Sequence, residues 1–300
     1  MQLKYICYNW LPLISDHVLD FSDAAYHSAN TSRIHDKKDF NPYMVRHGDF
    51  IFVKTDYIMS GEFESLYLNK IIQPFHLITG ISDYKIEECQ SYENIIKRPN
   101  LLSWTCVNPP SILNDKIKPV LIGFQEPDRP GGNLNLLNNI AANRKNFNQK
   151  KDKIFLPFHG QTNQKREEKI KFISSLDFVV SQDKKQDLES YYNSISEHKF
   201  CVCLEGNGPD THRISEVILA GSIPVIDSKC LKTIFDMHDI DHVFVDSFYN
   251  FSQKMFNDVL KRRYDAEKNN KIIDIEYNIK FIKRRNKWQV KSAGQLVQES

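Results

Sequence analysis

The sequence predicts an α/β protein made of two similar halves, each built around a parallel sheet. Apolar, β-prone runs alternate with helix-compatible segments in both halves, which is typical of parallel strands joined by crossover helices. The composition changes over residues 125–139, where the run Glu-Pro-Asp-Arg-Pro-Gly-Gly-Asn indicates an interdomain loop. A length of 300 residues is enough for two domains.

Each expected element corresponds to a short run of residues of one character. In the N-terminal half we predict a helix over residues 60–72 and strands over residues 5–9, 49–55, 74–79, 101–106 and 119–124. In the C-terminal half we predict strands over residues 153–158, 178–181, 200–204, 223–226 and 243–246. Helices are expected there over residues 166–174, 186–198, 211–220 and 251–266. The basic stretch 269–300 lacks strand signals, so we expect it to be helical.

The most informative segment is a strand, loop, helix and strand unit over residues 199–226. Its first strand ends at residues 206–209 (Gly-Asn-Gly-Pro), which require a tight loop, and Asp210 or Thr211 is a good N-cap for the following helix. Gly221 is expected to end that helix. A Gly-rich loop before a helix offers free backbone N–H groups and the positive end of the helix dipole. The unit therefore suits a phosphate or diphosphate.

Three charged side chains follow in the first two turns of this helix. His212 and Arg213 lie in the first turn and can donate hydrogen bonds to the same anion. Glu216 shares their helix face, where its carboxylate can accept hydrogen bonds from sugar hydroxyls. A Gly turn and a capped helix also occur in βαβ units that are only scaffold, so the loop alone is a weak signal. Its combination with these side chains and the closing Gly-Ser-Ile-Pro-Val is a much more specific signal.

This segment resembles the C-terminal signature of exostosin-like glycosyltransferases, which have the two-domain GT-B fold. The residues that match the family pattern are Cys203, Gly206, Asn207, Gly208, Thr211, His212, Arg213, Glu216, Gly221, Ile223, Pro224 and Val225. Leu204 and Glu205 depart from it, because the family has Pro and Arg at these positions. Pieces such as Val-Lys-Thr-Asp in the N-terminal half are also similar to the family, so the resemblance covers most of the chain.

The resemblance implies two Rossmann-like domains with a cleft between them. The N-terminal acceptor-side domain would span residues 1–135, with residues 270–300 crossing back to pack on it, and the nucleotide-sugar domain would span residues 136–269. The implied activity is transfer of a sugar from a nucleotide-diphosphate sugar to a hydroxyl of a glycan or glycoconjugate acceptor. The carrier would be uridine diphosphate, with guanosine diphosphate as the alternative. We expect no cofactor, because the nucleotide sugar is a co-substrate, and we expect an inverting, metal-independent reaction.

Open α/β sheets bind ligands at the carboxyl ends of their strands. In the N-terminal half this rule selects four segments that should face one cleft, residues 54–56, 80–83, 107–109 and 121–123. An inverting transfer needs a base that deprotonates the acceptor hydroxyl, and GT-B enzymes usually take it from the N-terminal domain. Asp83, which follows a Gly-containing turn, is our first candidate, and Asp56 is the second. The competing interpretation is that an Asp after a strand caps the next helix.

Arg166 is expected near the start of a helix in the donor half. A cation there can reach the donor diphosphate and stabilise the leaving group, although a solvated helix end fits equally well. Two alternatives stay open. The first is a metal-dependent GT-A transferase, which needs an Asp-x-Asp motif after an early strand. Asp239-Ile240-Asp241 matches this motif but lies after the Gly-rich segment rather than after an early strand, and we interpret it as a solvated turn. The second is a non-catalytic nucleotide- or glycan-binding module.

Composition limits the broad class of the protein. A net charge of +2 gives no electrostatic argument for a nucleic-acid partner. No apolar run is long enough to span a bilayer, and residues 1–10 are too short and polar for a signal peptide. We therefore expect a cytoplasmic protein without a membrane span. The six cysteines have no metal-ligand spacing, and we interpret them as small buried hydrophobic residues in a reducing compartment.

Overall fold

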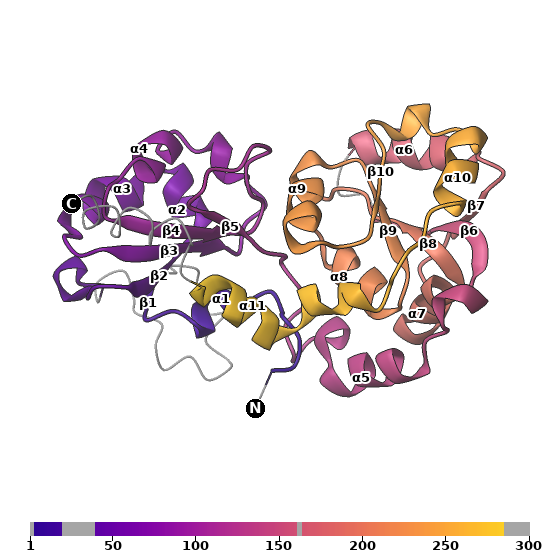
Figure 1. The fold of residues 1–300 in the computed structure, drawn as a ribbon, viewed down its shortest axis with the longest axis horizontal. Coiled ribbons are helices and arrows are strands. Elements are labelled where there is room, and N and C mark those ends of the chain that lie inside the picture. Colours follow the sequence, from indigo (N-terminus) through magenta and orange to yellow (C-terminus); the bar gives the residue numbers. More distant parts are fainter. Residues whose placement is uncertain (1–2, 20–39, 161–163, 285–300) are drawn as a thin grey trace, which may run out of the picture.

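The computed structural model describes residues 3–19, 40–160 and 164–284. Its described part forms two mixed α/β halves, each with a parallel sheet of five strands (Figure 1). The first sheet has the order β1-β2-β3-β4-β5, and the second has the order β10-β9-β8-β6-β7. Every strand pairing within these two sheets is parallel. The prediction of an α/β protein with two parallel sheets is confirmed.

The first half carries short helices around its sheet. Its strands are β1 (His17–Leu19), β2 (Asp49–Lys54), β3 (Phe75–Gly80), β4 (Leu101–Cys106) and β5 (Ile117–Pro119). Its α-helices are α1 (Trp10–Leu13), α2 (Thr55–Met59), α3 (Glu62–Leu66) and α4 (Tyr92–Ile96). Its 3-10 turns are η1 (Pro42–Met44), η2 (Leu68–Lys70) and η3 (Ile86–Glu88).

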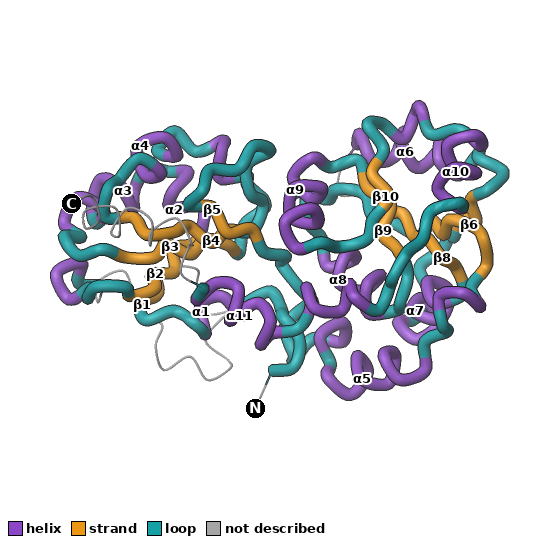
Figure 2. The backbone as a smooth tube through the Cα atoms, in the orientation of Figure 1, coloured by secondary structure: helices purple, strands orange, loops and turns teal. Residues whose placement is uncertain are grey.

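The second half has longer helices (Figure 2). Its strands are β6 (Lys151–Leu156), β7 (Val179–Ser181), β8 (His198–Val202), β9 (Ile223–Ile226) and β10 (Val243–Phe244). The helices that follow residue 133 are α5 (Leu134–Asn143), α6 (Gln164–Ser174), α7 (Leu188–Ser196), α8 (His212–Leu219), α9 (Lys229–His238), α10 (Gln253–Leu260) and α11 (Ile275–Lys283). The 3-10 turns from residue 130 onward are η4 (Pro130–Gly132), η5 (Phe147–Gln149), η6 (Phe248–Asn250) and η7 (Lys268–Ile273).

The central strands are buried on both faces, as expected where crossover helices cover a parallel sheet. In β2, Ile51 and Val53 belong to one hydrophobic cluster and Phe52 belongs to another. In β8, Phe200 and Cys201 are divided in the same way. Phe52 and Cys201 share a cluster that runs from the first half into the second. Since a fully buried Leu, Ile or Phe stabilises by roughly 1.5–3 kcal/mol, this shared cluster holds the two halves together.

The helices divide between the faces of each sheet. Buried residues of α2, α3 and α4 pack on one face of the first sheet, while α1 packs into the shared cluster. In the second half, α6 and α10 pack on one face, and α5, α7, α8 and α9 pack into the shared cluster on the other. The helices that follow β6 and β8 therefore lie on opposite faces of the second sheet.

The helix expected in the C-terminal stretch is present as α11, which lies beside α1 against the first half (Figure 1). Lys118 Nζ donates a hydrogen bond to the carbonyl oxygen of Ile282 at 2.7 Å, near the C-terminal end of α11. Ile275 N–H, at its other end, donates to the carbonyl oxygen of Lys4 at 3.1 Å. The remainder of the predicted helical stretch, residues 285–300, lies outside the described residues.

Two predicted strands of the first half are wrong in extent. Residues 5–9 form no strand, because Cys7 and Tyr5 make only isolated bridges, with Phe124 and Asp274 respectively. The strand expected over residues 119–124 is β5, Ile117–Pro119. Val120 N–H still donates to the carbonyl oxygen of Cys106 in β4 at 3.0 Å, and only Phe124 pairs with the N-terminal segment. Strand β1, at one edge of this sheet, was not predicted, because a run of three residues is too short to show a strand pattern.

Several predicted helices and loops also differ. The helix expected over residues 60–72 breaks into α3 and η2, because the buried Phe63 and Leu68 are five residues apart and cannot share one helix face. The loop expected over residues 125–139 contains the start of α5, whose N-cap Asn133 accepts a hydrogen bond from Leu136 N–H at 3.1 Å. Helix α9 was not predicted. The helices over 186–198 and 251–266 are shorter than expected, as α7 and α10.

Candidate functional site

The strand order of the second sheet marks one place for a ligand. From β6 the chain adds β7 on one side and β8, β9 and β10 on the other, so the order reverses between β6 and β8. Because the helices after β6 and β8 cover opposite faces, the loops at the two carboxyl ends separate and leave a crevice. In the described part of the first sheet the strands follow in sequence without such a reversal. The candidate site is therefore built at the carboxyl ends of β6 and β8.

The loop that follows β8 forms part of a cleft between the two halves. The cleft has a volume of about 690 Å³. Gly206, Asn207 and Gly208 line it from the second half, and Lys54, Asp56 and Asp83 are among the residues that line it from the first half. The backbone of Gly208 packs closely on the first half, since a Cβ there would lie 2.8 Å from the carbonyl oxygen of Asp83. The structure thus brings both base candidates to the predicted Gly-rich loop.

Arg166, on α6, lies directly beside this loop. Its Nε donates to the carbonyl oxygen of Glu205 at 2.8 Å, and a terminal nitrogen donates to that of Leu204 at 3.1 Å. Burial and the nearby Arg213 lower the pKa of Arg166, but a guanidinium stays charged at neutral pH. The sequence allowed either a cation near the diphosphate or a solvated helix end. The structure places the cation against the loop backbone.

Arg213 and Glu216 are joined by a residue that sequence reasoning missed. Tyr191 on α7 donates a hydrogen bond to Glu216 Oε2 at 2.7 Å and accepts one from Arg213 Nε at 3.1 Å. Another nitrogen of Arg213 donates to the carbonyl oxygen of Phe158 at 3.0 Å, just after β6. Burial alone would lower the pKa of Arg213. Tyr191 and Glu216 together raise this pKa by more than burial lowers it, so the net shift is upward. The Arg213 side chain therefore bridges from α8 to the end of β6 as a fixed cation.

Burial and the Glu216 carboxylate hold the pKa of the Tyr191 hydroxyl well above its usual range. It therefore stays protonated and can donate to Glu216 throughout the physiological range. The only sequence signal was the pair Tyr191-Tyr192 on a predicted helix. Neighbouring helix positions point about 100° apart, so Tyr192 enters the core while Tyr191 contacts Arg213 and Glu216.

The start of α8 is not the open anion site that the sequence predicted. Thr211 takes the N-cap position without a side-chain capping bond. Asp210 does not cap either, since its Oδ2 accepts a hydrogen bond from Ile122 N–H at 2.6 Å, across from the first half. Its carboxylate also receives a hydrogen bond from Thr211 N–H. The buried carboxyl group of Asp210 therefore stands where a ligand anion was expected, and the loop Gly206–Gly208 with Arg166 remains as the candidate anion site.

His212 is turned toward the first half as well. Its Nδ1 donates to the carbonyl oxygen of Gly123 at 2.8 Å, and its ring meets that of Tyr8 edge-on. Asn108, whose Oδ1 accepts from Asp210 N–H at 3.2 Å, adds a third polar contact between the halves. Of the four strand-end segments expected at one cleft, 54–56 and 80–83 line it, while 107–109 and 121–123 hold the start of α8.

Asp83 and Asp56 differ in their settings. Asp83 is exposed in the bend after β3 and caps no helix, because η3 begins three residues later with Lys85 at its N-cap position. Asp56 lies in the first turn of α2, with Lys54 Nζ 4.0 Å from its Oδ2. Ile81, next to this bend, has a φ of 55°, which is a strained value for a β-branched residue. Backbone strain of this kind is common at functional sites, and here it lies two residues from Asp83.

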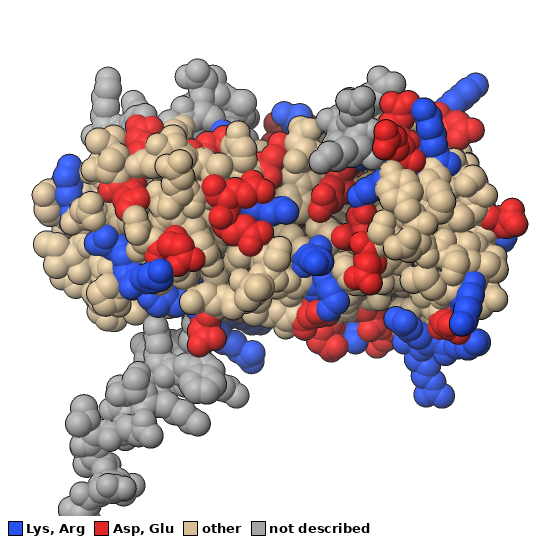
Figure 3. Space-filling view, turned by 90° about the horizontal axis from the view of Figure 1, so that it is seen from above, with Lys and Arg blue, Asp and Glu red and all other residues tan. Residues whose placement is uncertain are grey.

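Seen from one side, the molecule carries acidic and basic side chains in a mixed pattern, with acidic groups gathered over the middle of that face (Figure 3). The cleft itself contains both signs, since Glu88 and Glu205 line it together with Lys85 and the two Asp candidates. Glu205, which stands where the resembling family has Arg, thus adds a carboxylate to the cleft.

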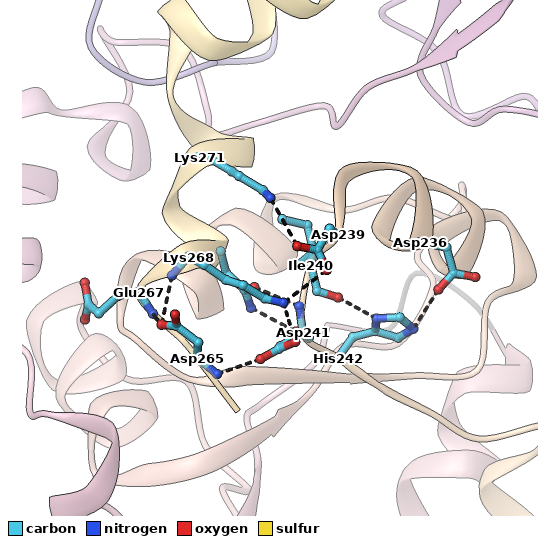
Figure 4. Close-up of polar contacts among 10 residues, drawn as sticks. Asp236, Asp239, Ile240, Asp241, His242, Asp265, Glu267, Lys268 and Lys271 are labelled. Atoms are coloured by element: carbon cyan, nitrogen blue, oxygen red, sulfur yellow. Dashed lines mark hydrogen bonds and ion pairs between the residues drawn. The ribbon is translucent and has the colours of Figure 1, made fainter. Parts of the chain in front are cut away.

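The Asp239-Ile240-Asp241 segment is an ion-paired turn (Figure 4). Lys268 Nζ lies 3.1 Å from Asp239 Oδ1 and 2.9 Å from Asp241 Oδ1, and Asp265 N–H donates to Asp241 Oδ2 at 2.6 Å. The Asp239 side chain is 79% exposed. The interpretation of a solvated turn therefore holds for Asp239, whereas the Asp241 side chain is 22% exposed and Ile240 is buried. Among the described residues no group of three or more His, Cys, Asp or Glu side chains is placed to hold a metal ion.

The six cysteines are all free and buried, which confirms their interpretation as small hydrophobic residues. In the described part of the chain no helix has the length and apolar character needed to cross a membrane. No protein-family model matches the sequence, and no curated protein matches it either. The function therefore has to be inferred from the geometry of the site.

Proposed function

We propose that the protein is a metal-independent, inverting glycosyltransferase of the GT-B type. It would move a sugar from a nucleotide-diphosphate sugar, with uridine diphosphate as carrier, to a hydroxyl of a glycan acceptor. The observation that carries the proposal is the position of the Gly206–Gly208 loop. This loop lies at the carboxyl end of β8 beside the strand-order reversal, has Arg166 behind it and faces Asp83 across the cleft.

In this reaction the diphosphate binds at the loop, where the charge of Arg166 stabilises it as a leaving group. The sugar extends into the cleft, and the acceptor enters from the first half. Asp83 takes the proton from the acceptor hydroxyl while its oxygen attacks the anomeric carbon. The bond from that carbon to the diphosphate oxygen breaks, and the nucleoside diphosphate leaves with the electron pair. Glu216, fixed by Tyr191, accepts hydrogen bonds from hydroxyl groups of the donor.

A thermal-shift screen of nucleoside diphosphates and nucleotide sugars tests the donor site. A ligand at one hundred times its dissociation constant should stabilise the protein by about 2.7 kcal/mol. Transfer or donor hydrolysis should then persist in excess EDTA. A strict requirement for Mn²⁺ or Mg²⁺ would count against this mechanism and favour a GT-A transferase. Binding without any turnover would instead identify a non-catalytic binding module.

A further inference from the structure

A second cavity lies at the carboxyl ends of β6 and β7, with a volume of about 690 Å³. This β6 crevice is lined by residues that include Phe158, His159, Arg166, Ile170, Ser181 and Asp183. Its size falls within the range of small-molecule sites. Arg166 lines the crevice and also donates hydrogen bonds to the carbonyl oxygens of Leu204 and Glu205. The crevice therefore adjoins the base of the loop at which we place the diphosphate.

Phe158 offers an aromatic surface in this crevice. Its side chain is 38% exposed, and the residue lies two positions after the end of β6. Arg213 holds the residue in place through the Phe158 carbonyl oxygen at 3.0 Å. An exposed ring on a fixed backbone suits the stacking of a flat aromatic ligand such as a nucleobase.

His159 adds a buried hydrogen-bond acceptor to the same crevice. The residue is only 9% exposed, and its Nδ1 lies 2.6 Å from the carbonyl oxygen of Pro157. Because a carbonyl can only accept, Nδ1 carries the proton and Nε2 carries a lone pair. This Nε2 is buried and has no hydrogen-bond partner. Burial, Arg213 and Arg166 together lower the pKa of His159 to about 2, so Nε2 stays an acceptor at neutral pH.

A buried acceptor without a partner carries a free-energy cost that a hydrogen bond from a ligand would remove. His159 Nε2 is such an acceptor, and its residue lines the β6 crevice. In the proposed function the sugar lies in the cleft and the diphosphate lies at the Gly206–Gly208 loop. The nucleoside is attached to the other end of the diphosphate, so it would lie on the side of the loop where Arg166 is. We propose that the β6 crevice holds the nucleoside of the donor and that His159 selects it by accepting a hydrogen bond from its N–H or O–H group. This inference rests on the proposed glycosyltransferase function. The donating group is either a base ring N–H or a ribose hydroxyl.

Titration calorimetry with UDP and GDP tests the inference without depending on turnover. Two analogues of each remove one donor at a time, a base N-methyl derivative and the 2′-deoxy derivative. A site that hydrogen-bonds a ligand N–H or O–H rejects the analogue that lacks it. We expect one of the two analogues to bind the wild-type protein about 3- to 10-fold more weakly, the effect of one neutral hydrogen bond.

The variant His159→Phe keeps the ring size and removes the acceptor. It should bind the unmodified nucleotide about 3- to 10-fold more weakly and should no longer distinguish it from the sensitive analogue. The matched control is His198→Phe. His198 is also buried with an unpartnered Nε2, but it lies at the amino end of β8, away from the crevice. Its substitution should leave nucleotide affinity unchanged.

If the wild-type protein binds no nucleoside diphosphate, the proposed function itself fails. If it binds one and His159→Phe retains the same affinity and the same discrimination, the function stands and this inference is wrong. Should His159→Phe not fold, the exposed Phe158 provides a second variant. Phe158→Ala should weaken binding of the same nucleotide, and an unchanged affinity would place the nucleoside outside the β6 crevice.

Discussion

Asp210 Oδ2 accepts a hydrogen bond from Ile122 N–H at 2.6 Å, and this contact joins the two halves of the molecule next to the candidate donor loop. The carboxylate is 4% exposed, and its second oxygen has no hydrogen-bond partner. Burial raises the pKa of Asp210 to about 7, which the hydrogen bonds from Ile122 and Thr211 oppose only in part. In the unfolded chain the pKa of an Asp is about 3.9. At a pH between these two pKa values, Asp210 is therefore protonated in the native state and ionised in the unfolded chain.

The first prediction is a pH dependence of stability that comes from Asp210. Because the native state binds more protons in the window from about pH 4 to pH 7, the free energy of unfolding falls as pH rises through it. A tenfold difference in proton affinity between the native and unfolded states corresponds to about 1.4 kcal/mol. Asp210→Asn keeps an acceptor for Ile122 N–H but cannot titrate. Urea denaturation at several pH values should show the wild-type protein losing stability relative to Asp210→Asn as pH rises.

Asp258→Asn is the control for this experiment. Asp258 is exposed, and its hydrogen bond with Lys261 lowers its pKa, so it titrates below the window. Its substitution should leave the slope of stability against pH unchanged between pH 4.5 and pH 7.5. Parallel curves for the wild-type protein and Asp210→Asn would show that Asp210 does not bind a proton in the native state.

The second prediction concerns the network around Tyr191. Arg213→Ala and Glu216→Ala should each abolish or strongly weaken nucleotide-sugar binding without unfolding the protein. Tyr191→Phe removes only the hydroxyl that joins them, so it should cost up to about tenfold in affinity, the effect of one hydrogen bond. Calorimetry measures all three. The control is Lys145→Ala, which removes an exposed cation paired with Glu197 in the same half. Wild-type affinity in both Ala variants would place the donor site elsewhere.

Local patterns were enough to predict the parts of the fold that depend on neighbouring residues. Gly221, with a φ of 70°, ends α8 as expected, and its N–H donates to the carbonyl oxygen of Ile218 at 2.9 Å. The central strands were also predictable, because a strand that is buried on both faces has a continuous run of apolar residues. The three-residue β1 was not, since its strand character comes from pairing with β2.

The roles of polar residues depended on contacts that no local pattern contains. Asp210 looked like an N-cap, but its partner Ile122 lies 88 residues earlier in the chain. His212 was expected to face an anion, and it binds the carbonyl oxygen of Gly123 from the first half instead. Local rules assume that a side chain near a helix start serves that helix. Docking of the two halves overrides this preference at α8.

The third prediction uses the close packing of Gly208 against Asp83. A Cβ at Gly208 would lie 2.8 Å from the Asp83 carbonyl oxygen and 3.2 Å from Asn108 Nδ2, so backbone must move. Gly208→Ala should lower the free energy of unfolding by about 1–3 kcal/mol, as overpacking does, and should lower turnover. Gly206→Ala in the same loop is the control, because the nearest atoms to its Cβ would be side-chain atoms of Thr211 and Arg166 at 3.3 and 3.4 Å, and the nearest backbone atom lies 4.0 Å away. Equal stability of both variants would show that the halves are not held this close in solution.

The last prediction concerns the base. Asp83 lies in the cleft opposite the loop and caps no helix, so replacing it with Asn should not destabilise the fold. Asn keeps the size of the side chain but cannot take a proton from the acceptor. Asp83→Asn should therefore lower turnover by a factor on the order of 10²–10⁴ with donor affinity nearly unchanged. Glu88→Gln is the matched control, because Glu88 also lines the cleft and its substitution likewise removes one charge.

If Asp83→Asn turns over normally, Asp56→Asn is the next variant to measure. Normal turnover in both would mean that the base lies outside the strand ends of the first sheet.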